Sequence, residues 1–463
     1  MTERLSTGSP RLDEILSGGF LPSAVNLITG VPGSGKTILS QQVVFRNATR
    51  ERPALYLTTL SEPLDKVLRY GQSLTFFDQA AVVDGRIVYD DIGAVVGSQD
   101  LDQVLATVDR YLKELRPGII VIDSFRIIKV MSHDVASFRQ FLYELLRRLS
   151  ASPTTSIWNA PYARDAVLQE AEAAVADAIL ALDVRQVAER EVRVAQVLKL
   201  RGSSFRTGEH GYRISASGLE AFPRLAEERI EAPFQLSDQR VNTGIKALDS
   251  LLAEGGYWAG AITLVAGPSG IGKTLMGLHF LYRGAEAGEP GILATFQEST
   301  SQLRRIITSF GWSPDDPNVH VLSRNVVDMN IDEWVYQVLD TAKEMKAKRV
   351  VVDSLRDVIG AARDETRFRE WMSSMTQRFS RAGVSLMLII EVPELFELRH
   401  VSEERISHLA DNVILLQYVQ EGGHLSRALT ILKTRAMRHQ PAVHRYDITQ
   451  EGFVLGEEIS LVR

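Results

Sequence analysis

Apolar and polar positions follow the same order twice along this chain. Short runs of consecutive apolar residues predict six buried strands, at residues 54–59, 118–122, 156–160, 291–296, 349–352 and 386–392. Amphipathic stretches such as residues 104–115 and 138–149 lie between them and predict helices. Strands that are buried on both faces and alternate with helices are typical of a mostly parallel sheet covered on each side.

Each half of the chain ends in sequence rich in strand-forming residues. These stretches are residues 191–201 with 211–214, and residues 425–435 with 443–448. We interpret each pair as a closing β-hairpin region. The expected fold class is therefore α/β, with two tandem domains that each contain a mostly parallel sheet, flanking helices and a closing hairpin.

The two halves are a tandem repeat. Each opens with a Thr-Gly, a Leu-Asp and a Gly-Gly pair, at residues 7–8, 12–13 and 18–19 and again at 243–244, 248–249 and 255–256. So long a period indicates duplicated domains rather than a solenoid. We place the first domain at residues 1–224 and the second at 238–463. The charged, proline-containing stretch 225–237 is the expected linker.

Composition restricts the classes of protein to which the chain can belong. Its 463 residues, 45% hydrophobic and 24% charged, fit two soluble globular domains. No apolar run approaches the length that spans a membrane, and the N-terminus lacks the apolar core of a signal peptide, so we expect a cytoplasmic protein without membrane partners. The absence of cysteine excludes disulfides and thiolate metal sites. A net charge of −6 argues against nucleic acid as a partner.

Two glycine-rich motifs carry the clearest chemistry. Both read Gly-x-x-x-x-Gly-Lys-Thr and follow a short apolar run. In a strand–loop–helix context this pattern predicts a phosphate-binding loop whose backbone N–H groups surround the phosphates of ATP. The predicted nucleotide-binding residues are Gly30, Gly33, Ser34, Gly35, Lys36 and Thr37, and Gly267, Gly270, Ile271, Gly272, Lys273 and Thr274. The lysines would reach the β- and γ-phosphates, and Thr37 and Thr274 would bind Mg²⁺.

Two further acids are candidate magnesium ligands. Asp123 and Asp353 each end an apolar strand and precede a serine. At the carboxyl end of such a strand, an acid can hold Mg²⁺ through water. The alternative is that each aspartate caps the helix that follows.

A hydrolase also needs a group that orients or deprotonates the attacking water. The halves align without a gap at residues 58–63 and 294–299, and one carboxylate is common to both, Glu62 in the first and Glu298 in the second. We predict that these two residues are catalytic. A helix-capping role is the alternative.

Paired cations recur near the end of each half. They are Lys199 with Arg201, and Lys433 with Arg435. Two residues apart on a strand, such side chains point to one face. We predict that each pair stabilises transition-state charge at the nucleotide of a neighbouring subunit. A solvated edge strand is the alternative.

With these residues, the chain resembles the KaiC family of circadian-clock ATPases, which are tandem RecA-like P-loop proteins. The resemblance covers residues 5–456 and is most specific at 406–418, 427–435 and 448–453. It implies two stacked rings in a hexamer, ATP between subunits in both rings, Lys-Arg pairs supplied in trans, and a signalling or clock-related role that can include a regulatory protein partner.

The chain departs from the family pattern at informative positions. The Glu-Glu pair that the family uses in catalysis becomes Ser61-Glu62 and Gln297-Glu298. Since the first glutamate is the one credited as general base, hydrolysis is slowed or depends on the second. The Ser-Thr pair that the clock protein phosphorylates reads Ser407-His408 here, which leaves Ser407 as the candidate acceptor of serine autokinase activity; a serine on a helix surface or interface is the alternative.

Three functions compete at this stage. The first is an oligomeric Mg²⁺-dependent ATPase with serine autokinase activity. The second is a nucleotide-gated scaffold with marginal hydrolysis, and the third, disfavoured by the acidic balance, is a DNA motor. The two sites are also expected to differ in turnover, because Glu391 ends a predicted strand near the second crevice whereas residues 157–162 contain no acid.

Overall fold

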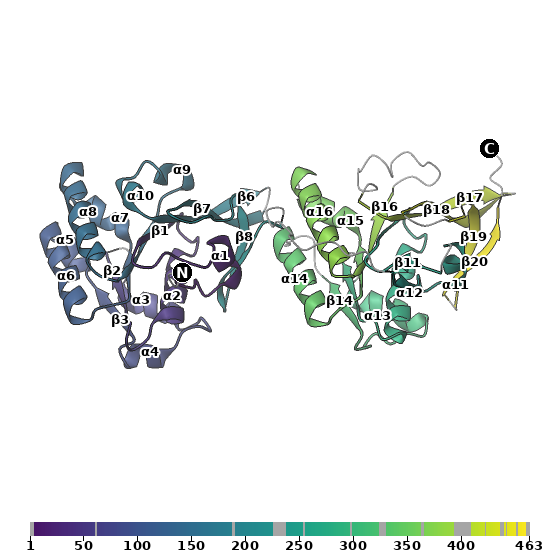
Figure 1. The fold of residues 1–463 in the computed structure, drawn as a ribbon, viewed down its shortest axis with the longest axis horizontal. Coiled ribbons are helices and arrows are strands. Elements are labelled where there is room, and N and C mark those ends of the chain that lie inside the picture. The colour runs from purple at the N-terminus through teal and green to yellow at the C-terminus, as the bar shows by residue number, and fades with distance from the viewer. Residues whose placement is uncertain are drawn as a thin grey trace. The chain divides into compact units, whose positions relative to one another are not determined.

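The computed structural model describes residues 4–60, 63–187, 190–225, 238–252, 255–296, 299–323, 330–362, 365–392, 409–421, 423–435, 439–440, 442–450 and 452–459. It divides into two compact units, Met1–Glu227 and Glu228–Arg463, which run from purple to teal and from green to yellow in Figure 1. Most of the predicted linker, residues 226–237, lies outside the described residues.

The first unit is built on one sheet with the strand order β3-β2-β4-β5-β1-β6-β7-β8-β9 in its described part. Neighbouring strands are parallel from β3 to β6 and antiparallel from β6 to β9. The strands are β1 Val25–Gly30, β2 Ala54–Thr58, β3 Ile87–Asp91, β4 Ile119–Asp123, β5 Thr155–Ala160, β6 Ala178–Val187, β7 Arg190–Leu200, β8 His210–Ser215 and β9 Gly218–Phe222. The helices are α1 Pro10–Ile15, α2 Lys36–Asn47, α3 Leu64–Gly71, α4 Gln79–Val83, α5 Gly93–Gly97, α6 Leu101–Glu114, α7 Phe125–Met131, α8 Val135–Ser150, α9 Arg164–Val167 and α10 Ala171–Val175.

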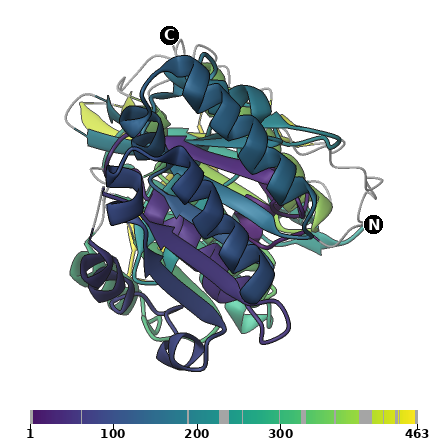
Figure 2. The ribbon, with the colours of Figure 1, turned by 90° about the vertical axis from the view of Figure 1, so that its left-hand side faces the viewer.

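Helices cover both faces of this sheet because alternate strand residues point to opposite sides. Within β1, Leu27 packs into the cluster formed with α6 and α8, and Ile28 packs into the cluster formed with α2. Figure 2, in which residues 101–150 are blue, has α6 and α8 lying across the strands. Parallel strands need such helical crossovers, so all their carboxyl ends, and the loops that follow, meet at one edge.

The second unit repeats this architecture. Its described strands are ordered β14-β13-β15-β16-β12-β17-β18-β19-β20, and a small ribbon pairs β10 with β11. The strands are β10 Arg240–Val241, β11 Tyr257–Trp258, β12 Ile262–Gly267, β13 Gly291–Thr295, β14 Val319–Ser323, β15 Arg349–Asp353, β16 Ser385–Glu391, β17 Asn412–Glu421, β18 His424–Thr434, β19 Val443–Thr449 and β20 Gly452–Glu458. The helices are α11 Lys246–Leu251, α12 Lys273–Glu286, α13 Thr300–Ser309, α14 Ile331–Glu344, α15 Leu355–Ala362 and α16 Glu365–Arg381.

The repeated Thr-Gly and Leu-Asp pairs have a structural role. The backbone N–H of Thr7 donates to Asp13 Oδ1, and that of Thr243 donates to Asp249 Oδ1, both at 2.7 Å. Each aspartate therefore fixes the turn before the first helix of its unit.

The α/β prediction is confirmed, and all six predicted strands and both predicted helices lie within two or three residues of the observed bounds. The closing region was underestimated, because it contains four antiparallel strands in each unit, of which β6 and β17 begin before the predicted hairpin. Within the described residues, no helix is long and apolar enough to cross a membrane.

Candidate nucleotide sites

Each glycine-rich motif forms the loop between a buried central strand and a long helix. In the first unit it connects β1 to α2, and in the second it connects β12 to α12. The helices begin after Gly35 and Gly272, whose φ angles of 94° and 107° lie in the left-handed region. The loops therefore present a helix N-terminus at the carboxyl edge of the sheet, where a phosphate binds favourably.

Glycine is required at these two positions for a second reason. A Cβ atom on Gly35 would lie 2.5 Å from Ile214 Cδ1, and one on Gly272 would lie 2.7 Å from Ile448 Cδ1. The antiparallel end of each sheet thus packs directly against the loop. Of the other predicted loop residues, Gly30 and Gly267 end the strands β1 and β12, and the following belong to the two turns: Gly33, Ser34, Gly270 and Ile271.

A tyrosine from the antiparallel strands holds each loop. The hydroxyl of Tyr212 donates to the Ser34 carbonyl at 2.7 Å, and that of Tyr446 donates to the Ile271 carbonyl at 2.6 Å. The motif search did not identify these residues. Each tyrosine follows the Lys-Arg pair of its own half at the same distance along the chain, and this repeat could have identified both residues.

The motif lysines fold back onto their own loops. Lys36 Nζ donates to the carbonyls of Gly30 and Val31 at 2.8 and 3.0 Å, and Lys273 Nζ donates to the Pro268 carbonyl at 2.7 Å. Burial lowers the pKa of both ammonium groups, and nearby carboxylates oppose this. A desolvated cation that neutral carbonyls hold is well suited to accept an anionic phosphate.

The threonine and aspartate predicted to bind magnesium lie together in each unit. Thr37 Oγ1 donates to Asp123 Oδ2 at 2.7 Å, and Thr274 Oγ1 donates to Asp353 Oδ2 at 2.6 Å. Each aspartate therefore lies beside the threonine of its own phosphate loop.

These residues fit Mg²⁺. It prefers oxygen ligands and is usually held by one or two carboxylates, waters and substrate phosphates, and each site offers one hydroxyl and one carboxylate. Beside the acids, on the next strand, the hydroxyls of Thr58 and Thr295 are buried without a hydrogen-bond partner among the described residues. They could bond to metal-bound water.

An arginine that the sequence analysis missed contacts the first loop. Arg193 of β7 donates through Nη1 to the Gly33 carbonyl at 2.7 Å and pairs with Glu191. Arg427 has the matching place on β18, six residues before the lysine of the cation pair. Comparing the two halves beyond the known motifs would have revealed both.

The Lys-Arg pairs lie at the other edge of the sheet. Lys199 stands opposite Ile179, near the start of β6, whereas Gly30 stands opposite Leu182 of the same strand. Lys199 Nζ donates to the carbonyls of Ala173 and Ala174, both at 3.1 Å. The pair is thus about 10 Å along the strand from the level of its own phosphate loop.

The remaining cations have matching positions. Arg201 pairs with Asp177 at 3.3 Å, and Arg435 pairs with Asp411 at 3.5 Å. Lys433 Nζ donates to the Ala410 carbonyl at 2.7 Å. Both aspartates also accept the backbone N–H at the start of the loop-bearing strand, so the pairs anchor the amino edge of each sheet.

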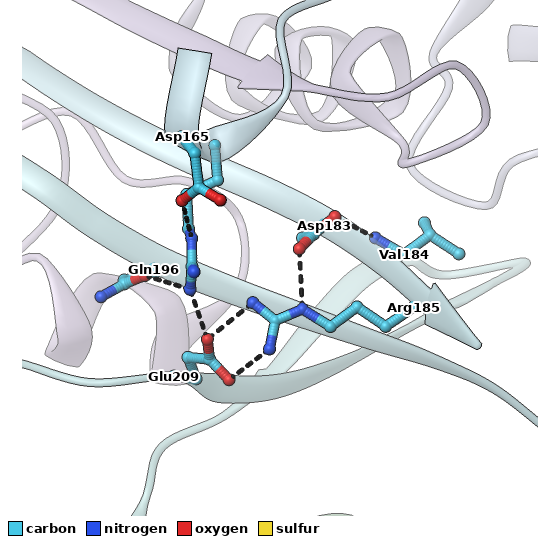
Figure 3. A network of polar contacts seen from close by, with 7 residues as sticks. Asp165, Asp183, Val184, Arg185, Gln196 and Glu209 are labelled. Carbon is cyan, nitrogen blue, oxygen red and sulfur yellow. Dashed lines mark hydrogen bonds and ion pairs between the residues drawn. The ribbon is translucent and has the colours of Figure 1, made fainter. Parts of the chain in front are cut away.

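A charged network in the first unit joins strand β6 and helix α9 through Glu209 (Figure 3). Glu209 accepts from Arg185 of β6 at 2.6 and 2.8 Å and from Arg164 of α9 at 2.5 Å, and Arg185 also bonds to Asp183. Although burial raises the pKa of Glu209, the hydrogen bonds and charge of Arg185 leave it below the ordinary value. The matching residues of the second unit are uncharged: Gln417, Val419 and Val443.

Several predicted residues lie outside the described residues. They are the candidate catalytic Glu62 and Glu298, their neighbours Ser61 and Gln297, and the candidate phosphoacceptor Ser407 with His408. Their roles remain predictions.

Comparison with known proteins identifies the family. A sequence model of the family described as "ATPase: KaiC" matches residues 5–226 and again residues 241–460. The chain belongs to the KaiC ATPase family. It is therefore a P-loop ATPase with one KaiC domain in each structural unit.

Named relatives of this KaiC-family chain align over nearly its whole length. It is 28% identical to the circadian clock oscillator protein KaiC of Rippkaea orientalis, over 95% of this chain and 86% of the relative. It is 26% identical to KaiC 1 of Synechocystis, with coverage of 97% and 88%. It is 28% identical to the circadian clock protein KaiC3 of Synechocystis, with coverage of 98% and 92%.

Proposed function

We propose that this KaiC-family ATPase hydrolyses Mg²⁺-ATP at two sites per chain, each completed by a neighbouring subunit of a ring. The observation that carries the proposal is the separation within each sheet. The phosphate loop lies at the carboxyl edge, and the Lys-Arg pair lies at the amino edge, where it cannot serve the loop of its own unit. Stacked or adjacent copies can bring the two together.

The chain's residues have distinct roles in this reaction. Lys36 and Lys273 bind the β- and γ-phosphates through charge, and the loop N–H groups orient them. Thr37 with Asp123, and Thr274 with Asp353, hold Mg²⁺, which neutralises phosphate charge when bound. Glu62 and Glu298 orient the attacking water.

The cation pairs of a neighbouring subunit complete each site. Lys199 with Arg201, and Lys433 with Arg435, stabilise the charge that develops on the transferred phosphoryl group. Six subunits is the number that the family resemblance suggests. The names of the relatives support a clock-related role. A signalling role, action in the cytoplasm and a regulatory protein partner are further parts of the proposal.

Serine autokinase activity is the second part of the proposal. The specific observation in its favour is Ser407, which the family resemblance matches to one of the two phosphoacceptors of the clock protein. Transfer to its hydroxyl forms a phosphate ester and releases ADP, with the hydroxyl proton passing to a base.

Incubation with γ-labelled ATP and Mg²⁺ tests both parts, with label followed on the protein and as free phosphate. We expect free phosphate from the wild type, less from Lys36→Ala or Lys273→Ala, and background from the double variant. Equal release by all four would overturn the ATPase assignment. Protein label that disappears in Ser407→Ala supports the autokinase, and its persistence there excludes Ser407.

Size measurement with and without ATP tests the ring, and a monomer in both states contradicts it.

A further inference from the structure

Glu391 lies at the carboxyl edge of the second sheet. It is neither one of the proposed magnesium ligands nor one of the predicted catalytic glutamates. Strand β16 lies between β15, which ends at Asp353, and β12, which ends at Gly267. Glu391, the last residue of β16, is in register with Gly267, and the next backbone N–H donates to the Gly267 carbonyl at 3.1 Å. Glu391 therefore adjoins the first residue of the phosphate loop.

The strand geometry also fixes the face on which Glu391 lies. Ile389 is in register with Asp353. A Cβ atom added to Gly277 of α12 would lie 3.2 Å from Ile389 Cδ1, so Ile389 faces α12. Residues two apart on a strand share a face. Glu391 consequently points to the side of the sheet that carries α12 and the loop, and its side chain is only half-buried there.

The electrostatics of Lys273 agree with this placement. Burial lowers the pKa of Lys273, and the carboxylate of Glu391 opposes the shift more strongly than that of Asp353 does. Glu391 and Lys273 therefore flank the same phosphate loop, and a γ-phosphate bound by Lys273 would have this carboxylate nearby.

Among the described residues, the first site has no acid at the matching place. Thr29 is in register with Ala160, so Pro161 stands beside Gly30 where Glu391 stands beside Gly267. In the first unit, burial lowers the pKa of Lys36, and the carboxylate that opposes this shift is Asp123. The two sites therefore differ by one carboxylate at the same place.

We propose that Glu391 is a catalytic residue of the second site, where it accepts the proton of the attacking water. The inference rests on the proposed ATPase function. The water oxygen forms a bond to the γ-phosphorus while the bond to the bridging oxygen of ADP breaks, and one water proton passes to the Glu391 carboxylate. The products are ADP and phosphate. Glu391 thereby supplies the base that Gln297, a neutral amide, cannot.

The test uses full-length chains in which only one site is active. In a Lys36→Ala background, Glu391→Gln should lower phosphate release at least about tenfold, while the affinity for a fluorescent ATP analogue changes less than about threefold, because the amide is isosteric. Glu457→Gln, an exposed acid of β20, is the matched control and should change neither. In a Lys273→Ala background, Glu391→Gln should leave the remaining release unchanged.

The outcomes separate the two levels of the proposal. Wild-type release no greater than that of the Lys36→Ala/Lys273→Ala variant overturns the ATPase function itself. Release that persists in Lys36→Ala and is unchanged by Glu391→Gln overturns only the role of Glu391.

Should the glutamine variant fail to fold, Glu391→Ala with added formate replaces it. Partial recovery of release by formate supports proton acceptance, and loss of release and analogue binding without recovery overturns it.

Discussion

The hydroxyl of Tyr56 donates a hydrogen bond of 2.8 Å to Asp123 Oδ2, the same oxygen that accepts the Thr37 hydroxyl. Tyr56 is fully buried on β2. The matching residue on β13 is Leu293, since Thr58 and Thr295 are in register with the two aspartates. Asp123, the predicted magnesium ligand of the first site, is thus held by a buried hydroxyl that the second unit does not provide at this place.

We predict that Tyr56→Phe weakens magnesium use at the first site alone. The carboxylate loses a charge-assisted hydrogen bond and is free to rotate away from its productive orientation. In a Lys273→Ala background, the Mg²⁺ concentration for half-maximal phosphate release should rise several-fold. Tyr89→Phe is the control, since the Tyr89 ring packs 5.2 Å from Tyr56 and its buried hydroxyl has no partner among the described residues. Identical magnesium curves for both variants would contradict the prediction.

The tyrosines that hold the phosphate loops should affect nucleotide binding. Tyr212→Phe or Tyr446→Phe leaves a buried loop carbonyl without its donor, a loss of about 0.5–1.5 kcal/mol. The KM for ATP of the matching site should therefore rise about two- to tenfold. Each substitution is measured in both single-site backgrounds, Lys36→Ala and Lys273→Ala. An equal rise at both sites would show that the loss is not local to one loop.

The Glu209 network should stabilise the first unit. Glu209→Gln removes the charge that Arg185 and Arg164 share, and we expect the unfolding free energy to fall by about 1–2 kcal/mol after allowance for solvent screening. Because the folded-state pKa of Glu209 is lowered, its contribution is present above the ordinary carboxyl pKa and is lost as the pH falls through the folded value. Asp165→Asn is the control, since Asp165 pairs with Arg164 but is 89% exposed. Urea unfolding that cannot distinguish the two variants would exclude a structural role for the network.

Acid should selectively destabilise the second unit through His279. Burial lowers its pKa to about 4, and Nε2 accepts the Phe453 backbone N–H at 3.1 Å. The unfolded chain binds a proton near pH 6.5 and the folded one does not, so stability falls as the pH drops from about 6.5 toward 4, by up to about 3 kcal/mol.

The first unit suggests the matched substitution for this test. Gln42 has the place of His279, and its Oε1 accepts the Leu219 N–H at 2.8 Å. We expect His279→Gln to keep the acceptor and to remove this part of the acid sensitivity. Thermal unfolding of both proteins between pH 7 and pH 4 measures the difference, and parallel curves would contradict the prediction.

Local patterns predicted much of this fold. The central strands are runs of buried residues and the long helices have one apolar face, so periodicity locates both. The edge strands β3 and β14 were missed because their residues are partly exposed and give no continuous apolar run. The extent of β6 and β17 depends on pairing with neighbouring strands, which periodicity does not encode.

The candidate sites divide in the same way. The loops and lysines belong to contiguous motifs, and the predicted magnesium acids each end an apolar strand, so local sequence identifies them as candidates. Tyr212 lies 178 residues from the carbonyl that it binds, and Tyr446 lies 175 residues away. Contacts of this kind depend on how strands assemble and become predictable only when the two halves are compared position by position.

The opposite placement of Lys36 and Lys199 in one sheet has a consequence for mixtures of defective chains. In the proposed ring, a chain with a damaged loop still offers intact cations to its neighbour, and a chain with damaged cations still offers an intact loop. Lys273→Ala and Lys433→Ala/Arg435→Ala, each made in a Lys36→Ala background, should both be inactive alone. When the two proteins are assembled together, some interfaces combine an intact loop with intact cations, and phosphate release should return. The loss of ATPase activity would then depend on which loop and which cation pair meet at an interface, and not on whether a given chain carries a substitution.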